Sequence, residues 1–342
     1  MCRLKAIVKK LRMLATIASI LFAAPTMKAL GQSALRAPSD ELREAIKLIG
    51  EHRDSQAVDL LKKVIAQNRD NPDAWFYLGV AYVDLAKIKD ASKALEIAIE
   101  LDPGFADAHL ALSDVLARTS QLERAASEAK RAFELKPDNP YAHHIYAFIN
   151  FRLGNMAQVI AHADIAIKQK PDFEEAYLIK AQALINRYAQ PEPSLDEATK
   201  EQYKQLYRSA AEPLKRYVEL TRDQESAEIW GNQAQALSSV PSSGKSEVLV
   251  GRDVATKVRL TSKPEPTYTE AARQYQIEGT VVLKAVFSAS GIVTNIHIYQ
   301  TLPLGLTEQA VKAARRIKFI PAVLDGKNVS MWIQLEYNFN LY

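Results

Sequence analysis

Apolar residues follow two different spacings along the chain. Before about residue 237 they recur every three to four positions, which predicts amphipathic helices. After residue 247 they alternate with polar residues, which predicts strands at 279–288, 293–300 and 329–341, with one helix at 306–317. The chain is therefore expected to contain a helical domain followed by a small α+β domain.

The helical part repeats itself at a fixed interval. Alanine recurs at positions 74, 108, 142 and 176, which are successively 34 residues apart. Three further series share this register: Ala57, Ala91 and Ala125; Ala98, Ala132 and Ala166; Pro103, Pro137 and Pro171. Small residues let two helices approach closely, and proline ends the second helix of each unit. Such a pattern predicts stacked helix pairs.

The segment 72–105 resembles the tetratricopeptide repeat, whose period is also 34 residues. The residues that carry the resemblance are Trp75, Leu78, Gly79 and Tyr82 on the first helix, then Ala91, Leu95, Ala98 and Pro103. The resemblance implies an α–α superhelix over 38–237. Within it we expect a capping helix at 40–49, an insertion at Pro191 and Pro193, a long helix at 201–220 and a final capping helix at 227–237.

A linker rich in Ser, Pro and Gly is expected at 238–246, followed by a last domain at 247–342. This domain contains, in order, Pro266, Tyr268, Ala272, Arg273, Ile277, Glu278, Gly279, Val281, the helix 310–316, Phe319, Pro321 and Gly326. In these residues the domain resembles the C-terminal domain of the TonB family, and Thr269 and Ile317 depart mildly from the family pattern. The resemblance implies a strand–strand–helix–strand fold that takes an extended peptide of an outer-membrane transporter alongside its last strand.

The last strand is the first candidate binding surface. Its candidate residues are Val329, Met331, Ile333, Gln334, Leu335, Glu336 and Tyr337. We expect the strand 329–341 to outrun the shorter strand 279–288 and so to leave backbone N–H and C=O groups for an added strand. Two other uses of this strand stay open: it covers the helix, or it pairs with a second copy of the chain.

The repeats supply a second candidate surface. By the register of the family, the concave groove carries Phe76, Asp114, Arg118, Tyr141, His144, Phe148, Phe151, Arg152 and Gln182. An aromatic groove with two arginines suits a peptide or an amphipathic segment. The alternative is that half of the apolar residues pack against a neighbouring helix.

The N-terminus has the order of a secretory signal. A cationic start precedes an apolar run from Met13 to Ala24, and the small residues Ala29 and Gly31 precede a cleavage site. As a helix, this run would reach about 18 Å, which is short of the roughly 30 Å hydrocarbon core. We therefore expect residues 1–31 to be a cleaved signal peptide and the protein to be exported to the periplasm. An uncleaved segment anchored in the inner membrane is the alternative.

Charge and chemistry narrow the function further. The first 33 residues hold six basic residues and no acid, so the remainder has 38 basic and 40 acidic residues and no basic field for nucleic acid. Cys2 is the one cysteine, which excludes disulfides from the mature chain. No nucleophile motif or phosphate loop is present. The six histidines lack metal-ligand spacing and favour packing, and His297 is expected to be solvated.

These observations predict a protein that binds other proteins and is not an enzyme, with no cofactor and no metal. We expect a periplasmic adaptor of the cell envelope, in which the repeats bind one partner and the last strand docks another. TonB-dependent outer-membrane receptors are the partners that the C-terminal resemblance implies. The alternative is a structural scaffold or homodimer with no role in transport.

Overall fold

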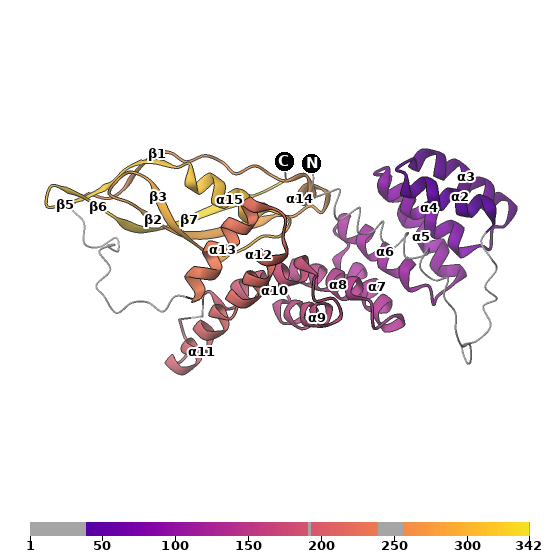
Figure 1. Cartoon of the computed structure of the whole chain (residues 1–342), viewed down its shortest axis with the longest axis horizontal. Helices are drawn as coiled ribbons and strands as arrows, with labels where there is room; N and C mark the ends of the chain where they lie inside the picture. The colour runs from indigo at the N-terminus through magenta and orange to yellow at the C-terminus, as the bar shows by residue number, and fades with distance from the viewer. Residues whose placement is uncertain (1–38, 191–192, 239–255, 342) are drawn as a thin grey trace. The chain divides into compact units, whose positions relative to one another are not determined.

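The computed structural model describes residues 39–190, 193–238 and 256–341 (Figure 1). The predicted signal peptide and most of the predicted linker lie outside these residues. The chain divides into two compact units, Met1–Pro137 and Asp138–Tyr342. This division falls between two repeats, because the later repeat helices pack with the C-terminal domain. The two units are described separately.

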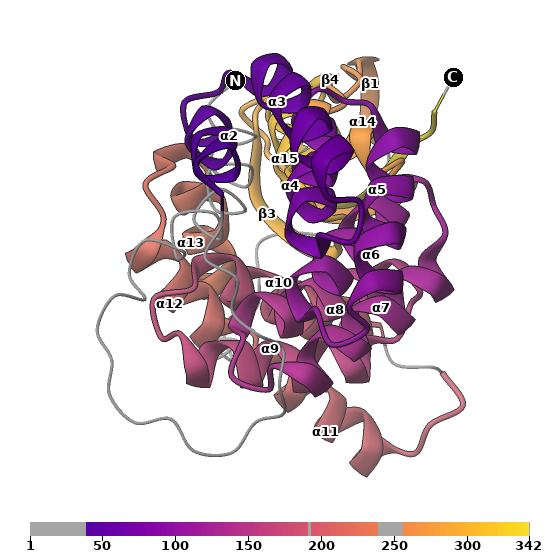
Figure 2. The same ribbon diagram turned by 90° about the vertical axis from the view of Figure 1, so that its right-hand side faces the viewer.

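Helical hairpins build the N-terminal unit, and Figure 2 shows them stacked in chain order. The helices are α2 (Asp40–Gly50), α3 (Asp54–Gln67), α4 (Pro72–Asp84), α5 (Ile88–Leu101), α6 (Ala106–Arg118) and α7 (Leu122–Leu135). Helix α4 shows why they begin where they do: the Asn71 side chain accepts from the backbone N–H of Ala74 at 3.2 Å, and Pro72 stands in the first turn. The predicted repeat architecture is confirmed.

The C-terminal unit begins with a series of helices that extends up to the predicted linker. They are α8 (Pro140–Arg152), α9 (Met156–Gln169), α10 (Glu174–Tyr188), α11 (Glu197–Arg208), α12 (Ala211–Leu220) and α13 (Gln224–Ser238). The predicted long helix 201–220 is wrong, because α11 ends before Ser209 and α12 begins after Ala210. Pro213 explains the break, since its ring clashes with the carbonyl of the residue four positions earlier and it is tolerated only in a first turn. Helix α12 packs against both α10 and α13.

The C-terminal domain is built on an antiparallel sheet in the order β3-β2-β7. Its strands are β2 (Gly279–Phe287), β3 (Val293–Gln300) and β7 (Met331–Phe339). Helix α15 (Leu306–Arg315) packs on β2 and β3 through a buried face that includes Leu306, Ala310 and Val311. The predicted strand–strand–helix–strand order is confirmed.

The predicted last strand 329–341 is divided in two. Val329 belongs to β6 (Lys327–Val329), which pairs with β5 (Ala322–Leu324) across the turn at Asp325 and Gly326, both with positive φ. Strand β7 then pairs with β2 residue for residue, from Gly279 opposite Phe339 to Phe287 opposite Met331. The expectation that the last strand outruns its neighbour is therefore wrong, because the β5–β6 turn holds Val329 in a different hairpin.

Short elements complete the domain. Strand β1 (Arg259–Ser262) pairs with β4 (Lys318–Ile320), and α14 (Glu270–Gln274) precedes β2. The sequence pattern did not predict them, since segments of three to five residues are too short to show a period.

Gly79 offers a test of the close helix packing in the N-terminal unit. A Cβ added at Gly79 would lie 2.6 Å from Cγ of Leu95, which is fully buried. We expect Gly79→Ala to lower the free energy of unfolding of this unit by about 1–3 kcal/mol, because α4 and α5 must move apart. Chemical denaturation followed by circular dichroism measures the change.

Gly50→Ala is the matched control, because a Cβ there meets nothing within 4 Å. Equal stability of the Gly79 and Gly50 variants would contradict the packing argument.

Candidate interaction surfaces

Strand β7 lies at an edge of its sheet. It pairs with β2 on one side, and among the described residues no strand pairs with it on the other. Its side chains alternate: Met331, Leu335 and Tyr337 are buried on the core side, while Gln334 and Glu336 are exposed on the opposite face. Ile333 is half-buried, and Val329 is half-buried in β6. The unpaired edge therefore comes from the strand order and not from a difference in strand length.

A lysine from the segment after β1 touches this edge. The ammonium of Lys263 donates to the backbone carbonyl of Glu336 at 2.8 Å, and it lies 4.7 Å from the centre of the Tyr337 ring. In an antiparallel pair, alternate residues direct both backbone groups away from the neighbouring strand. The lysine contact assigns Glu336, and with it Gln334, to the set that faces away from β2.

Trp332 was missed by the sequence analysis, although it stands in the middle of the predicted strand. It is half-buried on the same face as Gln334 and Glu336. The His297 ring lies 5.1 Å from the Trp332 ring, and the Lys284 ammonium lies 5.7 Å from it. The expectation that His297 is solvated is therefore wrong. Burial, and then the charge of Lys284, lower the pKa of His297.

At the opposite edge of the sheet, side-chain amides from the repeat helices pair with the backbone at Ile298 and at Thr301, just after β3. Gln233 on α13 accepts from the N–H of Ile298 at 2.9 Å and donates to its carbonyl at 3.1 Å. Asn186 on α10 accepts from the N–H of Thr301 at 2.7 Å and donates to its carbonyl at 3.1 Å. Each amide thus pairs with both backbone groups of one residue, as a neighbouring strand would.

Further contacts fix α13 to the C-terminal domain. The indole N–H of Trp230, a fully buried residue, donates to Glu308 at 3.1 Å. Two ion pairs flank it, Glu225–Lys312 at 2.6 Å and Glu228–Arg315 at 2.9 Å. A cavity of about 690 Å³ lies among α13, β3 and α15, with side-chain amides and aliphatic groups in its lining. Helices α10 and α13 therefore support the sheet at its β3 edge.

The predicted groove in the C-terminal unit faces its own C-terminal domain in part. The Phe148 ring packs edge-on against Tyr275 at 5.2 Å between ring centres. Burial lowers the pKa of Arg152, and the nearby Tyr275 and Tyr268 oppose this shift. The buried Gln182 donates to the carbonyl of Leu302 at 3.5 Å. Phe148 and Gln182 are therefore buried against the same polypeptide, and Arg152 lies half-buried near it.

The remaining groove residues of this unit pack within the repeats. Tyr141 accepts from the Lys170 ammonium at 2.8 Å and packs on Phe173 at 5.2 Å. His144 packs on the same Phe173 ring at 4.9 Å, and Phe151 is buried. Tyr141, His144 and Arg152 are the half-buried members, so they are the part of the predicted groove in this unit that solvent reaches.

In the N-terminal unit, the predicted groove residues are mostly buried. Phe76 is buried against Phe105 at 4.9 Å. Asp114 and Arg118, predicted as two separate groove positions, form a buried ion pair of 2.9 Å on α6. The arginine thereby compensates an aspartate and is unavailable to an acidic ligand.

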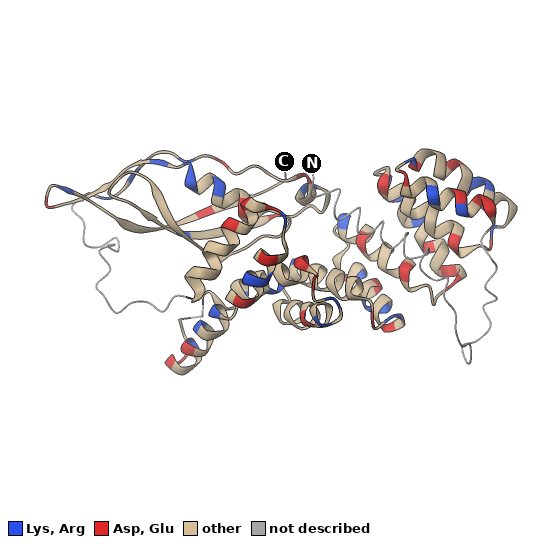
Figure 3. Cartoon of the chain, in the orientation of Figure 1, with Lys and Arg blue, Asp and Glu red and all other residues tan. Residues whose placement is uncertain are grey.

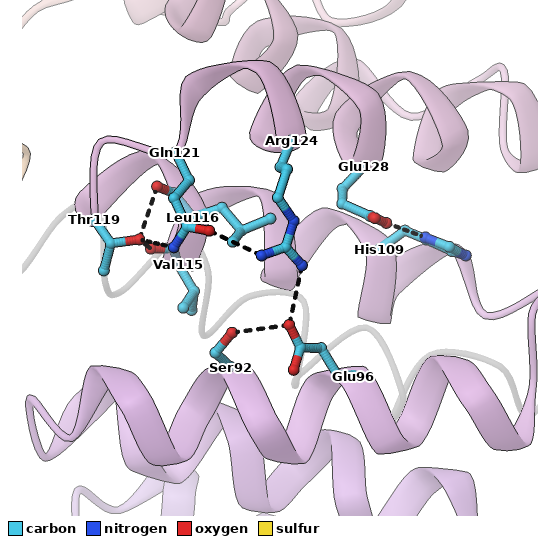
Figure 4. Close-up of polar contacts among 9 residues, drawn as sticks. All are labelled: Ser92, Glu96, His109, Val115, Leu116, Thr119, Gln121, Arg124 and Glu128. Atoms are coloured by element: carbon cyan, nitrogen blue, oxygen red, sulfur yellow. Dashed lines mark hydrogen bonds and ion pairs between the residues drawn. The ribbon is translucent and has the colours of Figure 1, made fainter.

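Histidines in the repeats have protein partners. Figure 4 shows His109 beside Glu128, with 2.6 Å between Nδ1 and Oε2. His143 and His162 face each other with 3.0 Å between their Nδ1 atoms. In the part of the chain that the structure describes, no group of three or more His, Cys, Asp or Glu residues is placed to hold a metal ion. Within the same residues, no helix has the length and apolar character to cross a membrane.

Two family models match the chain. Residues 264–341 match the model described as Gram-negative bacterial TonB protein C-terminal, and residues 48–115 match a tetratricopeptide-repeat model. No curated protein matches. The chain thus carries tetratricopeptide repeats followed by a TonB-type C-terminal domain, as predicted. Both families are non-catalytic and serve protein interaction, and the TonB C-terminal family belongs to the Gram-negative envelope.

Solved structures of repeat proteins are similar to the helical part. A crystal structure of MamA is 19% identical, covers 51% of this chain and 96% of its own, and has a TM-score of 0.43. YrrB, described as a TPR protein with an unusual peptide-binding site, is 18% identical, covers 55% and 89%, and also has a TM-score of 0.43. A MamA double mutant is 16% identical, covers 55% and 98%, and has a TM-score of 0.45.

Gln233→Leu tests the closure of the β3 edge. The leucine keeps the volume of the side chain but leaves the Ile298 N–H without its acceptor, a loss of about 1–3 kcal/mol. We expect faster hydrogen exchange at the Ile298 amide and a lower melting temperature. Gln235→Leu is the control, because Gln235 is exposed on the same helix. Unchanged exchange at Ile298 in the Gln233 variant would contradict the pairing.

The His143–His162 pair predicts acid sensitivity of the C-terminal unit. Burial, and then His143, lower the pKa of His162 to about 4. Between about pH 4 and pH 6.5 the unfolded state binds a proton at His162 that the folded state does not. The free energy of unfolding is therefore at its full value above about pH 6.5 and falls as the pH is lowered towards 4. The loss is on the order of 1–2 kcal/mol after solvent screening of this half-buried ring is taken into account.

An NMR titration of the His162 ring measures the pKa directly, and unfolding of wild type and His162→Gln at pH 7 and pH 4.5 measures the stability. A ring that titrates near pH 6.5 would refute this prediction.

Proposed function

We propose that this protein is an adaptor of the Gram-negative cell envelope, in which the outer edge of β7 receives an extended segment of a partner protein. The observation that supports the proposal is that the two edges of the sheet differ in the pairing of their backbone groups. The β3 edge is paired with the amides of Gln233 and Asn186, whereas β7 has no strand beside it among the described residues. An added strand therefore finds donors and acceptors at β7.

The TonB-type domain supports the finer parts of the proposal. We place the protein in the periplasm, and we propose the periplasmic segments of TonB-dependent outer-membrane receptors as partners of β7. The half-buried Tyr141 and His144 are a second, smaller contact surface on the repeats. Pairing of β7 with a second copy of the chain is the alternative, since the same open edge would serve it.

Proline at an outward-facing position of β7 tests strand addition. Gln334→Pro removes one backbone N–H from the outer edge but leaves the ladder to β2 intact, because Gln334 faces away from β2. We expect a partner bound along β7 to be held roughly 2- to 10-fold more weakly, which is the effect of one lost hydrogen bond. The measurement is affinity capture from a Gram-negative envelope extract, followed by titration with the captured protein.

Gln334→Ala is the matched control, since it loses the same side chain and keeps the N–H. Circular dichroism verifies that both variants fold. Capture of envelope receptors by wild type and Gln334→Ala, and weaker binding of the same receptors by Gln334→Pro, would support the proposal. Equal capture by the two variants would refute strand addition, and a dimer that only Gln334→Pro dissociates would favour the second copy as the occupant.

A further inference from the structure

The charged groups around the β7 edge are unequal in sign. Lys263 lies on the edge itself, and its neighbour Ser262 pairs with Lys318 across the β1–β4 ribbon. Arg316 and Glu265 are both close enough to act on the Tyr337 hydroxyl, with opposite signs. Two cations, Lys263 and Arg316, therefore stand near Tyr337 against one acid, Glu265. Figure 3 colours the Lys and Arg positions of the chain blue and the Asp and Glu positions red.

Lys263 occupies the very group that an added strand needs. Its ammonium takes the carbonyl of Glu336, which is an acceptor of the outer edge. The N–H of an incoming strand must displace the ammonium to pair with this carbonyl. The displaced ammonium then loses its hydrogen bond and its place over the Tyr337 ring.

A carboxylate on the incoming strand would compensate this loss. Lys263 is exposed and its side chain is long and flexible, so the ammonium can turn towards a side chain beside Tyr337. A neutral side chain leaves the ammonium with water alone, and a basic one meets the like charges of Lys263 and Arg316. Lysine on a sheet edge is also a known means of discouraging unselective strand pairing.

We infer that Lys263 is a specificity-determining residue of the β7 edge, which selects extended segments with an acidic side chain opposite Tyr337. This inference rests on the proposed strand addition and adds the chemistry of the partner to it. The occupant is thus an acidic extended peptide segment of another protein. A second copy of the chain would instead bring a second Lys263 to the same edge.

Two synthetic probes test the inference on the full chain. Both are blocked nine-residue peptides of alternating Val and Thr, one with a central Asp and the other with a central Asn. We expect wild type to bind the Asp peptide roughly two- to fivefold more tightly, the range that an exposed ion pair supports. Fluorescence anisotropy in low and high salt measures both affinities, and high salt should remove the preference.

Variants of Lys263 separate charge from shape. Lys263→Met should bind both peptides equally, Lys263→Arg should keep the preference, and Lys263→Glu should favour the Asn peptide. Lys327→Met is the matched control, because Lys327 is an exposed lysine of the β5–β6 hairpin, and it should behave as wild type. Hydrogen exchange of the β7 amides verifies that each variant keeps its sheet.

The outcomes distinguish this inference from the proposal beneath it. Equal binding of both peptides by wild type and Lys263→Met would overturn the selection of acid and leave strand addition in place. Binding of neither peptide by any variant would overturn strand addition and the inference with it. A wild-type dimer at micromolar concentration in light scattering, formed without peptide, would show that a second copy occupies the edge and would also overturn the inference.

Discussion

The pairing of two side-chain amides with the backbone of β3 and of Thr301 just after it is the contact on which the rest of the C-terminal unit depends. A strand edge in contact with a helix normally leaves backbone donors and acceptors without partners, and each buried one costs about 1–3 kcal/mol. Gln233 and Asn186 remove that cost, since an amide offers one donor and one acceptor at the spacing of a peptide group. The sheet can therefore end against helices.

Because the β3 edge is paired with helices, the domain can add a strand at one side only. A three-stranded sheet has two edges, and both would ordinarily accept another strand. With the β3 edge paired to α10 and α13, strand addition is directed to β7, at the far side of the sheet from these two helices. Helix α8 also meets the domain, since Phe148 packs on Tyr275 and Arg152 lies near the same ring, so the domain covers part of the predicted groove.

The sequence predicted the features that depend on local spacing. Close packing of α4 on α5 needs a small residue, and Gly79 lies there beside Leu95. The predicted ends of β2 and β3, strands of alternating polarity, agree with the structure within one residue. Errors arose where a particular turn or side-chain contact, and not the spacing of apolar residues, decides the outcome. Val329 fits an alternating strand, but the turn at Asp325 ties it to β5. Arg118 fits a groove, but Asp114 one turn earlier neutralises it. Nothing in a repeat pattern indicates that the C-terminal domain will cover Phe148.

An open strand edge explains binding better than it explains selection. Every strand edge offers the same backbone N–H and C=O groups, so the backbone of β7 alone would accept any extended segment, including β7 of another copy. Discrimination must come from side chains that stand at the edge, and the described residues place two kinds there. Lys263 adds charge on the core side, and Trp332, with Lys284 and His297 beside it, adds an aromatic surface on the other face. A segment that alternates its side chains across β7 meets both, so its two faces are selected separately.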